Sequence, residues 1–221
     1  MTVPTAEPKN VAGLPRIGTD ESGKGDYFGD LVVAGVYLNA ASEPLAQSIG
    51  VRDSKKLTDT TAKTIAKEIE TAFPFEIVRI SPATYNDLYE KMGNLNRLLA
   101  WAHARVIENL LPRTDAELIV SDQFGNAAVL ENALMRSGRT VRLLQIVRGE
   151  RDLAVAAASI IARATFLRRL DVLSQEVGFQ LPKGAGNTIP IGKELYAKGG
   201  LPLLRHVAKL HFATTQQITH G

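Results

Sequence analysis

Two neighbouring carboxylates, Asp20 and Glu21, stand just before a glycine-rich stretch that contains a single cation, Lys24. Carboxylates held this close together repel each other, so burying them requires a metal ion, a proton or a cation. Gly23 and Gly25 allow the backbone to approach a ligand closely, because they carry no side chain. An acidic turn after a strand would have the same composition, so the rest of the chain must decide between a turn and a site.

The same stretch matches most of a phosphate-binding loop, whose pattern is G-x-x-x-x-G-K-[ST]. Gly18, Gly23 and Lys24 fit the pattern, and the apolar run 117–122 could supply the accompanying strand and its acid. However, Gly25 stands where a Ser or Thr hydroxyl should bind magnesium, and the two carboxylates would direct negative charge at the phosphates. In a competing interpretation the carboxylates are the active groups and the glycine-rich stretch holds the substrate.

Residues 20–29, Asp-Glu-Ser-Gly-Lys-Gly-Asp-Tyr-Phe-Gly, closely resemble the opening active-site motif of ribonuclease HIII. This family is the branch of type 2 ribonuclease H with Gly-Lys-Gly where ribonuclease HII has Gly-Arg-Gly. Five further blocks resemble the same family in the same order: 53–58, 94–96, 121–124, 154–163 and 181–185. The resemblance therefore extends over residues 16–215, and chance similarity is a poor explanation for so many ordered blocks.

The resemblance implies an α/β, ribonuclease H-like fold with a five-stranded mixed sheet, helices on both faces and a helical C-terminal extension. In that fold the first and fourth strands are neighbours, so Asp20 and Asp122 would converge from distant parts of the sequence. Glu150, after the fifth strand, would join Asp20, Glu21 and Asp122 as the fourth acid. Asp152 is the alternative, but it is better explained as the N-cap of the following helix.

In this family the four acids would bind two Mg²⁺ or Mn²⁺ ions, which neutralise the carboxylates and bridge a phosphate. Water would attack the scissile phosphate in line and leave 5′-phosphate and 3′-hydroxyl ends. The implied substrate is an RNA–DNA hybrid, whose 2′-hydroxyls the main chain of Gly23, Lys24 and Gly25 would contact across the minor groove. The side chains of Lys24 and of four further residues are expected to contact the substrate: Ser54, Lys55, Asn96 and Lys183.

Three other functions remain open on the sequence alone. A ribonuclease HII-like junction enzyme would cut at single ribonucleotides embedded in DNA, a phosphate-binding-loop NTPase would bind ATP, and a nucleic-acid-binding module would be catalytically silent. A silent module has no reason to keep four acids at the ends of strands. The acids therefore favour a metal-dependent endonuclease.

The composition is that of an ordinary globular protein of 221 residues, with 45% hydrophobic residues and a net charge of +3. The absence of cysteine excludes disulfides and thiolate metal sites, so a metal must bind oxygen or imidazole ligands. The first sixteen residues lack the pattern of a signal peptide and no apolar run reaches membrane-spanning length, so we expect a cytoplasmic protein. We also expect it to be a monomer. Eight arginines accompany only two acids between residues 136 and 169, which predicts contact with nucleic-acid phosphates: Arg136, Arg139, Arg142, Arg148, Arg151, Arg163, Arg168 and Arg169.

Hydrophobic patterns place the candidate acids at the ends of secondary-structure elements. Strands are predicted at 16–20, 31–38, 75–80, 117–121 and 140–147. Helices are predicted at 59–73, 82–91, 95–111, 127–137 and 151–177, with one or two short helices at 191–210. His103 in the helix 95–111 is expected to be hydrogen-bonded or at the surface rather than a ligand.

The ends of the chain are expected to be loose. Residues 1–15 are rich in proline and lack apolar periodicity, so they are predicted to be a tail, and the chain after Thr215 is predicted to be frayed. The catalytic domain would comprise residues 16–215. This tail leaves no room for the separate N-terminal substrate-binding domain that is typical of the family.

Overall fold

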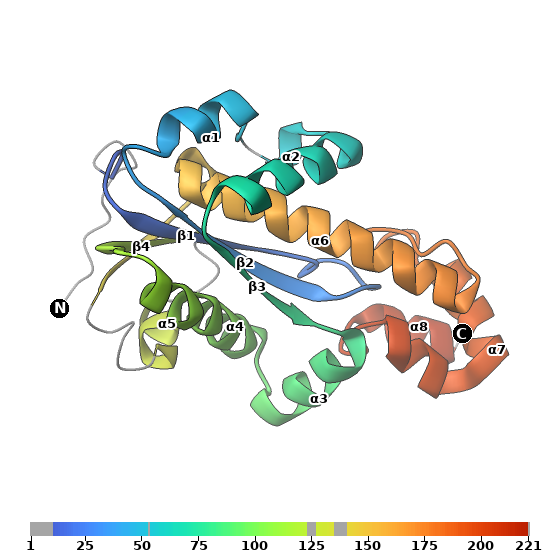
Figure 1. The fold of residues 1–221 in the computed structure, drawn as a ribbon. Coiled ribbons are helices and arrows are strands. Elements are labelled where there is room, and N and C mark those ends of the chain that lie inside the picture. The colour runs from blue at the N-terminus through green and yellow to red at the C-terminus, as the bar shows by residue number, and fades with distance from the viewer. Residues whose placement is uncertain (1–10, 53, 123–126, 135–140, 221) are drawn as a thin grey trace. The chain divides into compact units, whose positions relative to one another are not determined.

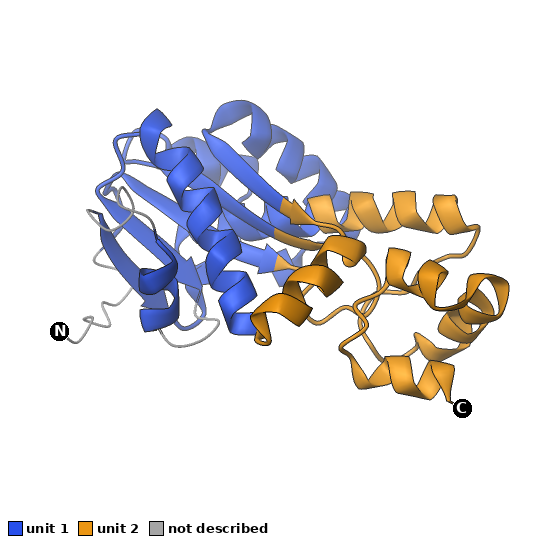
Figure 2. Cartoon of the chain, turned by 90° about the horizontal axis from the view of Figure 1, so that it is seen from below, with its two compact units in different colours: residues 1–21, 33–78, 95–164 blue, residues 22–32, 79–94, 165–221 orange. Residues whose placement is uncertain are grey.

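The computed structural model describes residues 11–52, 54–122, 127–134 and 141–220. The chain divides into two compact units, which alternate along the sequence and are coloured separately in Figure 2. The first unit spans residues 1–21, 33–78 and 95–164, and the second spans residues 22–32, 79–94 and 165–221. All four candidate acids therefore belong to the first unit, whereas the Gly-Lys-Gly stretch belongs to the second.

Five strands form one sheet in the order β3-β2-β1-β4-β5 (Figure 1). Their bounds are β1 (Arg16–Ser22), β2 (Leu31–Leu38), β3 (Phe75–Ile80), β4 (Leu118–Asp122) and β5 (Arg142–Ile146). β4 pairs in parallel with both β1 and β5, so the carboxyl ends of these three strands lie at the same edge of the sheet. Thr19 is paired with Ser121, and the residues that follow them, Asp20 and Asp122, are therefore brought together.

Helices of the first unit cover both faces of its sheet (Figure 1). α1 (Glu43–Ile49), α2 (Asp59–Ala72) and the beginning of α6 (Leu153–Val177) lie on one face, and α4 (Leu95–Leu110) and α5 (Ala127–Ala133) lie on the other. A Cβ atom at Gly18 would be only 2.2 Å from the backbone of Ala154 and Val155, so α6 packs directly on the backbone of β1. The small residues at the start of α6 permit this approach, as the sequence predicted.

The core of the first unit extends to the beginning of the described chain. Val11 is 2% exposed and packs in a cluster with five residues of β4, β5 and α6: Leu118, Val120, Leu144, Ile146 and Val155. Residues 11–15 were assigned to the loose tail, and at least Val11 is held by this apolar contact. The remaining tail residues, 1–10, lie outside the described residues.

The second unit is mainly helical. It contains the segment 22–32, which connects β1 to β2, together with α3 (Pro82–Met92), the end of α6, α7 (Ile189–Val207) and α8 (Ala213–Thr219). α7 is interrupted at Gly200, where φ is 62°, and thus consists of two helical stretches. This agrees with the one or two short helices predicted at 191–210.

α8 contradicts the prediction that the chain frays after Thr215. The helix continues to Thr219, and Ile218 is only 4% exposed. Ile218 packs on Gly192 of α7, where a Cβ atom would lie 2.2 Å from the Cδ1 atom of Ile218. The end of the chain is ordered by this contact with α7, which local sequence patterns do not reveal.

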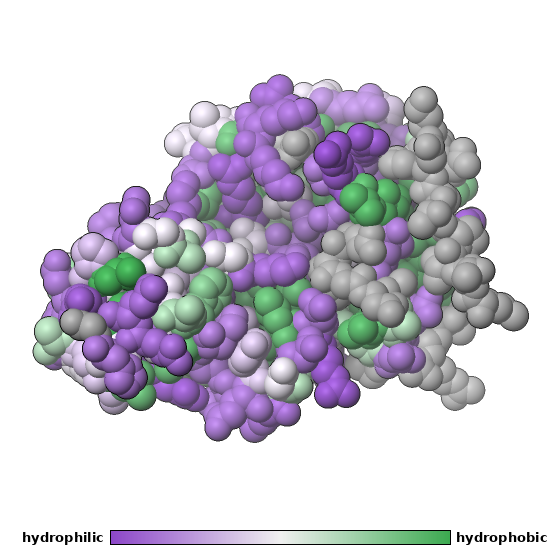
Figure 3. Space-filling view, turned by 180° about the vertical axis from the view of Figure 1, so that it is seen from behind, coloured by the Kyte–Doolittle hydropathy of each residue, from purple (hydrophilic) through white to green (hydrophobic). Residues whose placement is uncertain are grey.

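Hydrophilic residues cover most of the face seen in Figure 3, and hydrophobic residues appear there in small separate groups. Among the helices of the described chain, none is both long enough and apolar enough to cross a membrane.

Candidate active site

The four predicted acids are placed at one edge of the sheet in the first unit. Asp20 and Glu21 lie near the end of β1, Asp122 ends β4, and Glu150 lies in the short 3-10 turn η5 (Gly149–Arg151) after β5. The Oδ1 atom of Asp122 accepts a hydrogen bond of 2.8 Å from the backbone N–H of Gly149, which holds this turn against β4. A Cβ atom at Gly149 would lie 3.0 Å from the Cα atom of Asp122, so a side chain there would push the turn away.

The Asp20 carboxyl group is strongly perturbed by its surroundings. Burial and repulsion by Glu21 and Asp122 raise its pKa from 3.8 to about 8, although hydrogen bonds from Ser159 and from the backbone of Glu21 oppose this rise. The N–H of Glu21 donates to Oδ1 of Asp20 at 2.8 Å. At neutral pH Asp20 therefore holds a proton unless a cation is bound beside it.

The raised pKa predicts how the stability of the metal-free protein depends on pH. Between about pH 4 and pH 8 the folded protein binds more protons at Asp20 than the unfolded chain does, so the free energy of unfolding falls as pH rises through this window. Asp20→Asn removes the ionisable group and should raise the free energy of unfolding at pH 9 by about 1–3 kcal/mol, equivalent to one or two pKa units. At pH 4 the variant and the wild type should differ little.

Urea unfolding in EDTA at both pH values measures this difference. Asp87→Asn, at an exposed residue of α3 that pairs with Arg205, serves as the matched control and should show no comparable pH dependence. A stability difference between Asp20→Asn and wild type that is the same at pH 4 and pH 9 would show that the pKa of Asp20 is normal.

Ser54 and Ser159 form a chain of hydroxyl groups behind Asp20. Ser54 is buried, and its Oγ atom lies 2.8 Å from Oγ of Ser159, which in turn hydrogen-bonds Asp20. Ser54 was predicted to contact the substrate, but its hydroxyl is directed into the protein. Its neighbour Lys55 is 79% exposed, and its Nζ atom lies 3.9 Å from Oε1 of Glu150. Lys55 is thus at the acid site and open to solvent, whereas Ser54 supports the site from behind.

The arginine-rich segment is only partly available to a ligand. Arg163 donates to the backbone carbonyl of Ser54 and, at 2.7 Å, to Oδ1 of Asp59. In the second unit, Arg169 lies 3.4 Å from Oδ2 of Asp30. Arg136 and Arg139 lie outside the described residues. The prediction that this arginine cluster contacts phosphates therefore does not extend to all of its members, because Arg163 and Arg169 are paired with acids within the protein.

His103 of α4 is fully buried behind Glu21. Its Nδ1 atom lies 2.9 Å from Oγ1 of Thr19, and its Nε2 atom lies 3.2 Å from Oε2 of Glu21. An ionised carboxylate can only accept hydrogen bonds, so Nε2 donates to Glu21, and Nδ1 shares a hydrogen bond with the Thr19 hydroxyl. The prediction of a hydrogen-bonded histidine is confirmed. Its orienting contact with Glu21 was missed, because the helical pattern does not show which strand this face of α4 covers.

Asp152 is buried and caps α6, as the sequence predicted. Its Oδ1 atom accepts hydrogen bonds from the backbone N–H groups of Ala154 and Val155 at 2.9 and 3.1 Å. Its Oδ2 atom accepts from Nε of Arg16 at 2.7 Å. With its oxygens used in this way, Asp152 is a structural acid, whereas the Glu150 side chain remains 18% exposed at the edge of the sheet. This difference favours Glu150 as the fourth acid of the site.

The carboxylates suit hard divalent cations, which prefer oxygen ligands. Asp20, Glu21 and Asp122 lie close enough for their charges to repel, and a bound cation would remove this repulsion. In the ranges that the structure covers, no three acidic or histidine side chains are clustered tightly enough to enclose one metal ion.

Asn96, which was predicted to contact the substrate, lies in the first turn of α4.

In the second unit, the two glycines of the Gly-Lys-Gly stretch have different roles. Gly23 has a φ of 87°, and a Cβ atom there would lie 2.1 Å from the carbonyl oxygen of Asp30, so this glycine is required by the fold. Gly25 is exposed, and a Cβ atom there would have no neighbour within 4 Å. The backbone of Gly25 is therefore open to a ligand. Lys24 lies between them and is partly exposed.

The loop that carries this stretch is fixed by two other segments of the second unit. Gly184 donates to Oδ1 of Asp26 at 2.6 Å and accepts from the N–H of Tyr27 at 2.9 Å. These bonds bring the exposed Lys183 next to the loop. On the other side, the buried Nζ atom of Lys209 donates to the carbonyl oxygens of Asp26 and Gly29, at 2.8 and 2.6 Å. Burial lowers the pKa of Lys209 to about 8.

Comparisons with known proteins agree with this arrangement. The Ribonuclease HII family model matches residues 17–215. Ribonuclease HIII of Protochlamydia amoebophila is 46% identical over 205 residues, which cover 92% of this chain and 68% of that protein. Ribonuclease HIII of Bacillus mycoides is 37% identical, with 96% of this chain and 70% of that protein covered. This chain belongs to the ribonuclease HIII family.

Solved structures of ribonuclease HIII share the fold. A crystal structure of Bst-RNase HIII in complex with Mn²⁺ has a TM-score of 0.89 and 32% sequence identity, and the match covers 96% of this chain and 71% of that one. The predicted ribonuclease H-like fold, with a five-stranded mixed sheet and C-terminal helices, is confirmed. The chain is thus an enzyme of the ribonuclease H type.

Membership of the ribonuclease HIII family argues against the phosphate-binding-loop NTPase. The local structure agrees, because such a loop leads from a strand into a helix, whereas residues 23–30 lead into the strand β2. The Gly-Lys sequence therefore resembles that of phosphate-binding-loop NTPases, but the local structure does not.

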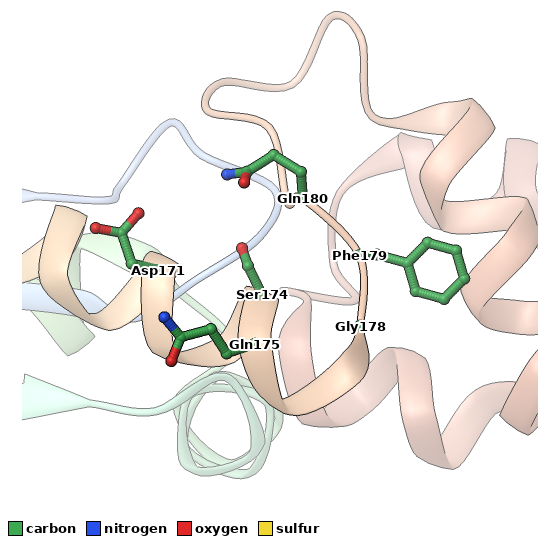
Figure 4. Close-up of a pocket in the computed structure, with 6 residues that line it drawn as sticks. All are labelled: Asp171, Ser174, Gln175, Gly178, Phe179 and Gln180. Atoms are coloured by element: carbon green, nitrogen blue, oxygen red, sulfur yellow. The ribbon is translucent and has the colours of Figure 1, made fainter.

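In the second unit, a pocket with a volume of about 340 Å³ lies where α6 ends and is shown in Figure 4. Ser174 in its lining makes hydrogen bonds within the protein at the end of α6: it donates to the carbonyl of Leu170 and accepts from the N–H of Leu181. The ring of Phe179 points away from the other labelled side chains in Figure 4. The pocket does not contain any of the predicted site residues.

Proposed function

We propose that this ribonuclease HIII hydrolyses the RNA strand of RNA–DNA hybrids, with Asp20, Glu21, Asp122 and Glu150 as ligands of two Mg²⁺ or Mn²⁺ ions. The observation that carries the proposal is the meeting of acids from β1, β4 and η5 at one edge of the sheet. The Mn²⁺ complex of the similar Bst enzyme supports the choice of ion. All four acids come from one chain, so the proposed site needs no residue of a second subunit. We further propose that the enzyme acts as a monomer and is located in the cytoplasm.

Neighbouring side-chain and backbone groups orient three of these acids through hydrogen bonds. His103 orients Glu21, Ser159 donates to Asp20, and the N–H of Gly149 fixes Asp122. When bound, divalent ions would supply the activation of water and the stabilisation of the leaving 3′ oxygen, which yields 5′-phosphate and 3′-hydroxyl ends. The protein would contribute the oxygen ligands, three of which are oriented by these contacts.

Substrate selection is assigned to groups in both units. The open backbone at Gly25, supported by Gly23, can contact 2′-hydroxyls, which distinguish RNA from DNA. Lys24, Lys55 and Lys183 are exposed or partly exposed cations that can contact phosphates, and Asn96 is a further candidate contact. Ser54 acts indirectly, through Ser159.

Cleavage of an end-labelled RNA–DNA hybrid with Mg²⁺, with Mn²⁺ and with EDTA tests the proposal. We expect cleavage within the RNA strand with at least one ion, none with EDTA, and no cleavage of a DNA duplex of the same sequence. The products should be substrates for a ligase that requires 5′-phosphate and 3′-hydroxyl ends. Hydrolysis that persists in EDTA, or equal cleavage of the DNA duplex, would contradict the proposed function.

A further inference from the structure

A pocket with a strongly cationic lining lies beside Glu150 in the first unit. Its volume is about 570 Å³, which is in the range of small-ligand sites. Besides Glu150 and the beginning of α6, four basic residues line it: Arg52, Lys56, Arg148 and Arg151. Among the described residues of the lining, four cations and one acid leave an excess of three positive charges. We call it the cationic pocket.

The four cations of the pocket are not neutralised within the described parts of the chain. Each is exposed, and none makes a side-chain hydrogen bond or ion pair with a described residue. Three other arginines of the first unit are paired with acids: Arg16 with Glu43 and Asp152, Arg113 with Glu76, and Arg163 with Asp59. Like charges that line a concavity focus a positive potential there. The pocket therefore attracts anions, and its unpaired donors can bind them.

The backbone at this pocket is strained. Arg148 has a φ of 59°, and within the described ranges it is the one non-glycine residue in the left-handed region. This conformation costs energy for any residue with a side chain, and glycine would relieve the cost. The turn places Arg148 and Arg151 on the two sides of Glu150 in sequence, and all three line the same pocket. Arg148 thus adopts a backbone conformation that is unfavourable for a residue with a side chain. This indicates that its side chain has a function.

We propose that the cationic pocket binds phosphates of the nucleic-acid backbone next to the phosphate that is cleaved. This inference rests on the proposed function, because Glu150 both lines the pocket and belongs to the proposed catalytic acids. Guanidinium groups bind phosphate oxygens through two parallel hydrogen bonds, so arginine suits this ligand better than a point charge does. Of the eight arginines between residues 136 and 169, Arg148 and Arg151 are those assigned to the substrate.

Hybrid binding without hydrolysis tests the pocket. The test variant is Lys56→Gln/Arg151→Gln, and the matched control is Lys67→Gln/Arg105→Gln. The control loses the same two charge types at exposed positions of α2 and α4 that do not line the pocket. Fluorescence anisotropy with a labelled RNA–DNA hybrid in EDTA gives Kd over roughly 50 to 200 mM salt.

The pocket variant should bind about tenfold more weakly at low salt, and its slope of log Kd against log salt should fall by about one to two, as expected for one or two lost phosphate contacts. The control should keep both values. Thermal unfolding shows that both variants are folded. A pocket variant with the affinity and the slope of the wild type would overturn the proposal.

Two further measurements distinguish failure of the proposed function from failure of the proposed phosphate site. If the wild type does not hydrolyse hybrids but the pocket variant still loses hybrid affinity, the proposed function fails and the phosphate site stands. Isothermal titration with inorganic tripolyphosphate distinguishes a free polyphosphate from the nucleic-acid backbone. Loss of tripolyphosphate binding in the pocket variant, with unchanged hybrid binding, would overturn the assignment to nucleic acid.

Discussion

Asp122→Asn should reduce turnover on an RNA–DNA hybrid by at least about a thousandfold, as expected when a group that acts mainly in the transition state is removed. Hybrid binding in EDTA and thermal stability should remain close to those of the wild type. Asparagine has nearly the same shape as aspartate, and its side-chain oxygen can still accept the hydrogen bond from the N–H of Gly149. It cannot supply a charged ligand to a metal ion, so catalysis and binding should separate.

Single-turnover rates with saturating enzyme measure this effect without interference from product release. The matched control is Asp87→Asn, which makes the same chemical change at an exposed residue of the second unit. We expect the control to cleave at the wild-type rate. Cleavage by Asp122→Asn within tenfold of the wild type would remove Asp122 from the proposed set of ligands.

A duplex with one ribonucleotide embedded in DNA should be cut roughly tenfold to a thousandfold more slowly than a uniform hybrid. A clamp that contacts the 2′-hydroxyls of several successive nucleotides loses most of these hydrogen bonds when a single ribose is present. Each lost bond costs roughly 0.5–1.5 kcal/mol. Two or three lost bonds thus account for the expected range, at about 1.4 kcal/mol per factor of ten.

Initial rates on the two duplexes, at equal enzyme and ion concentrations, measure this preference. The same DNA sequence with a run of four ribonucleotides serves as an intermediate substrate and should be cut at an intermediate rate. Equal rates on all three substrates, with a cut on the 5′ side of the single ribonucleotide, would instead indicate a ribonuclease HII-like junction enzyme.

Elements with strong local patterns were predictable from the sequence. β2 and β3 have the predicted bounds, because an uninterrupted apolar run forms the first and Pro74 and Pro82 bracket the second. α1 was not predicted, since Ala46 is its single buried residue and so short a helix leaves no amphipathic pattern. α8 was mispredicted because its order depends on the contact between Ile218 and Gly192.

The acids of the site were found through their types, their places after strands and the family resemblance. Their supporting residues were not, because His103 and Ser159 reach Glu21 and Asp20 from helices on opposite faces of the sheet. Ser54 was predicted to contact the substrate, and it lies in a block, residues 53–58, that resembles the family. Its burial follows from the packing of η2 (Ser54–Lys56) near α6, where Ser159 and Arg163 bind it.

The position of Lys209 has a consequence for the mobility of the glycine loop. One ammonium group holds two carbonyls of the same turn, at Asp26 and Gly29, although it lies about 180 residues later in the chain. If the turn released one of these carbonyls, the buried ammonium group of Lys209 would lose a hydrogen-bond acceptor. Both bonds should therefore break together when the loop opens, and the open state should be rare. The backbone of Gly25 is then preorganised for a ligand, and binding avoids the entropy cost of ordering a flexible loop.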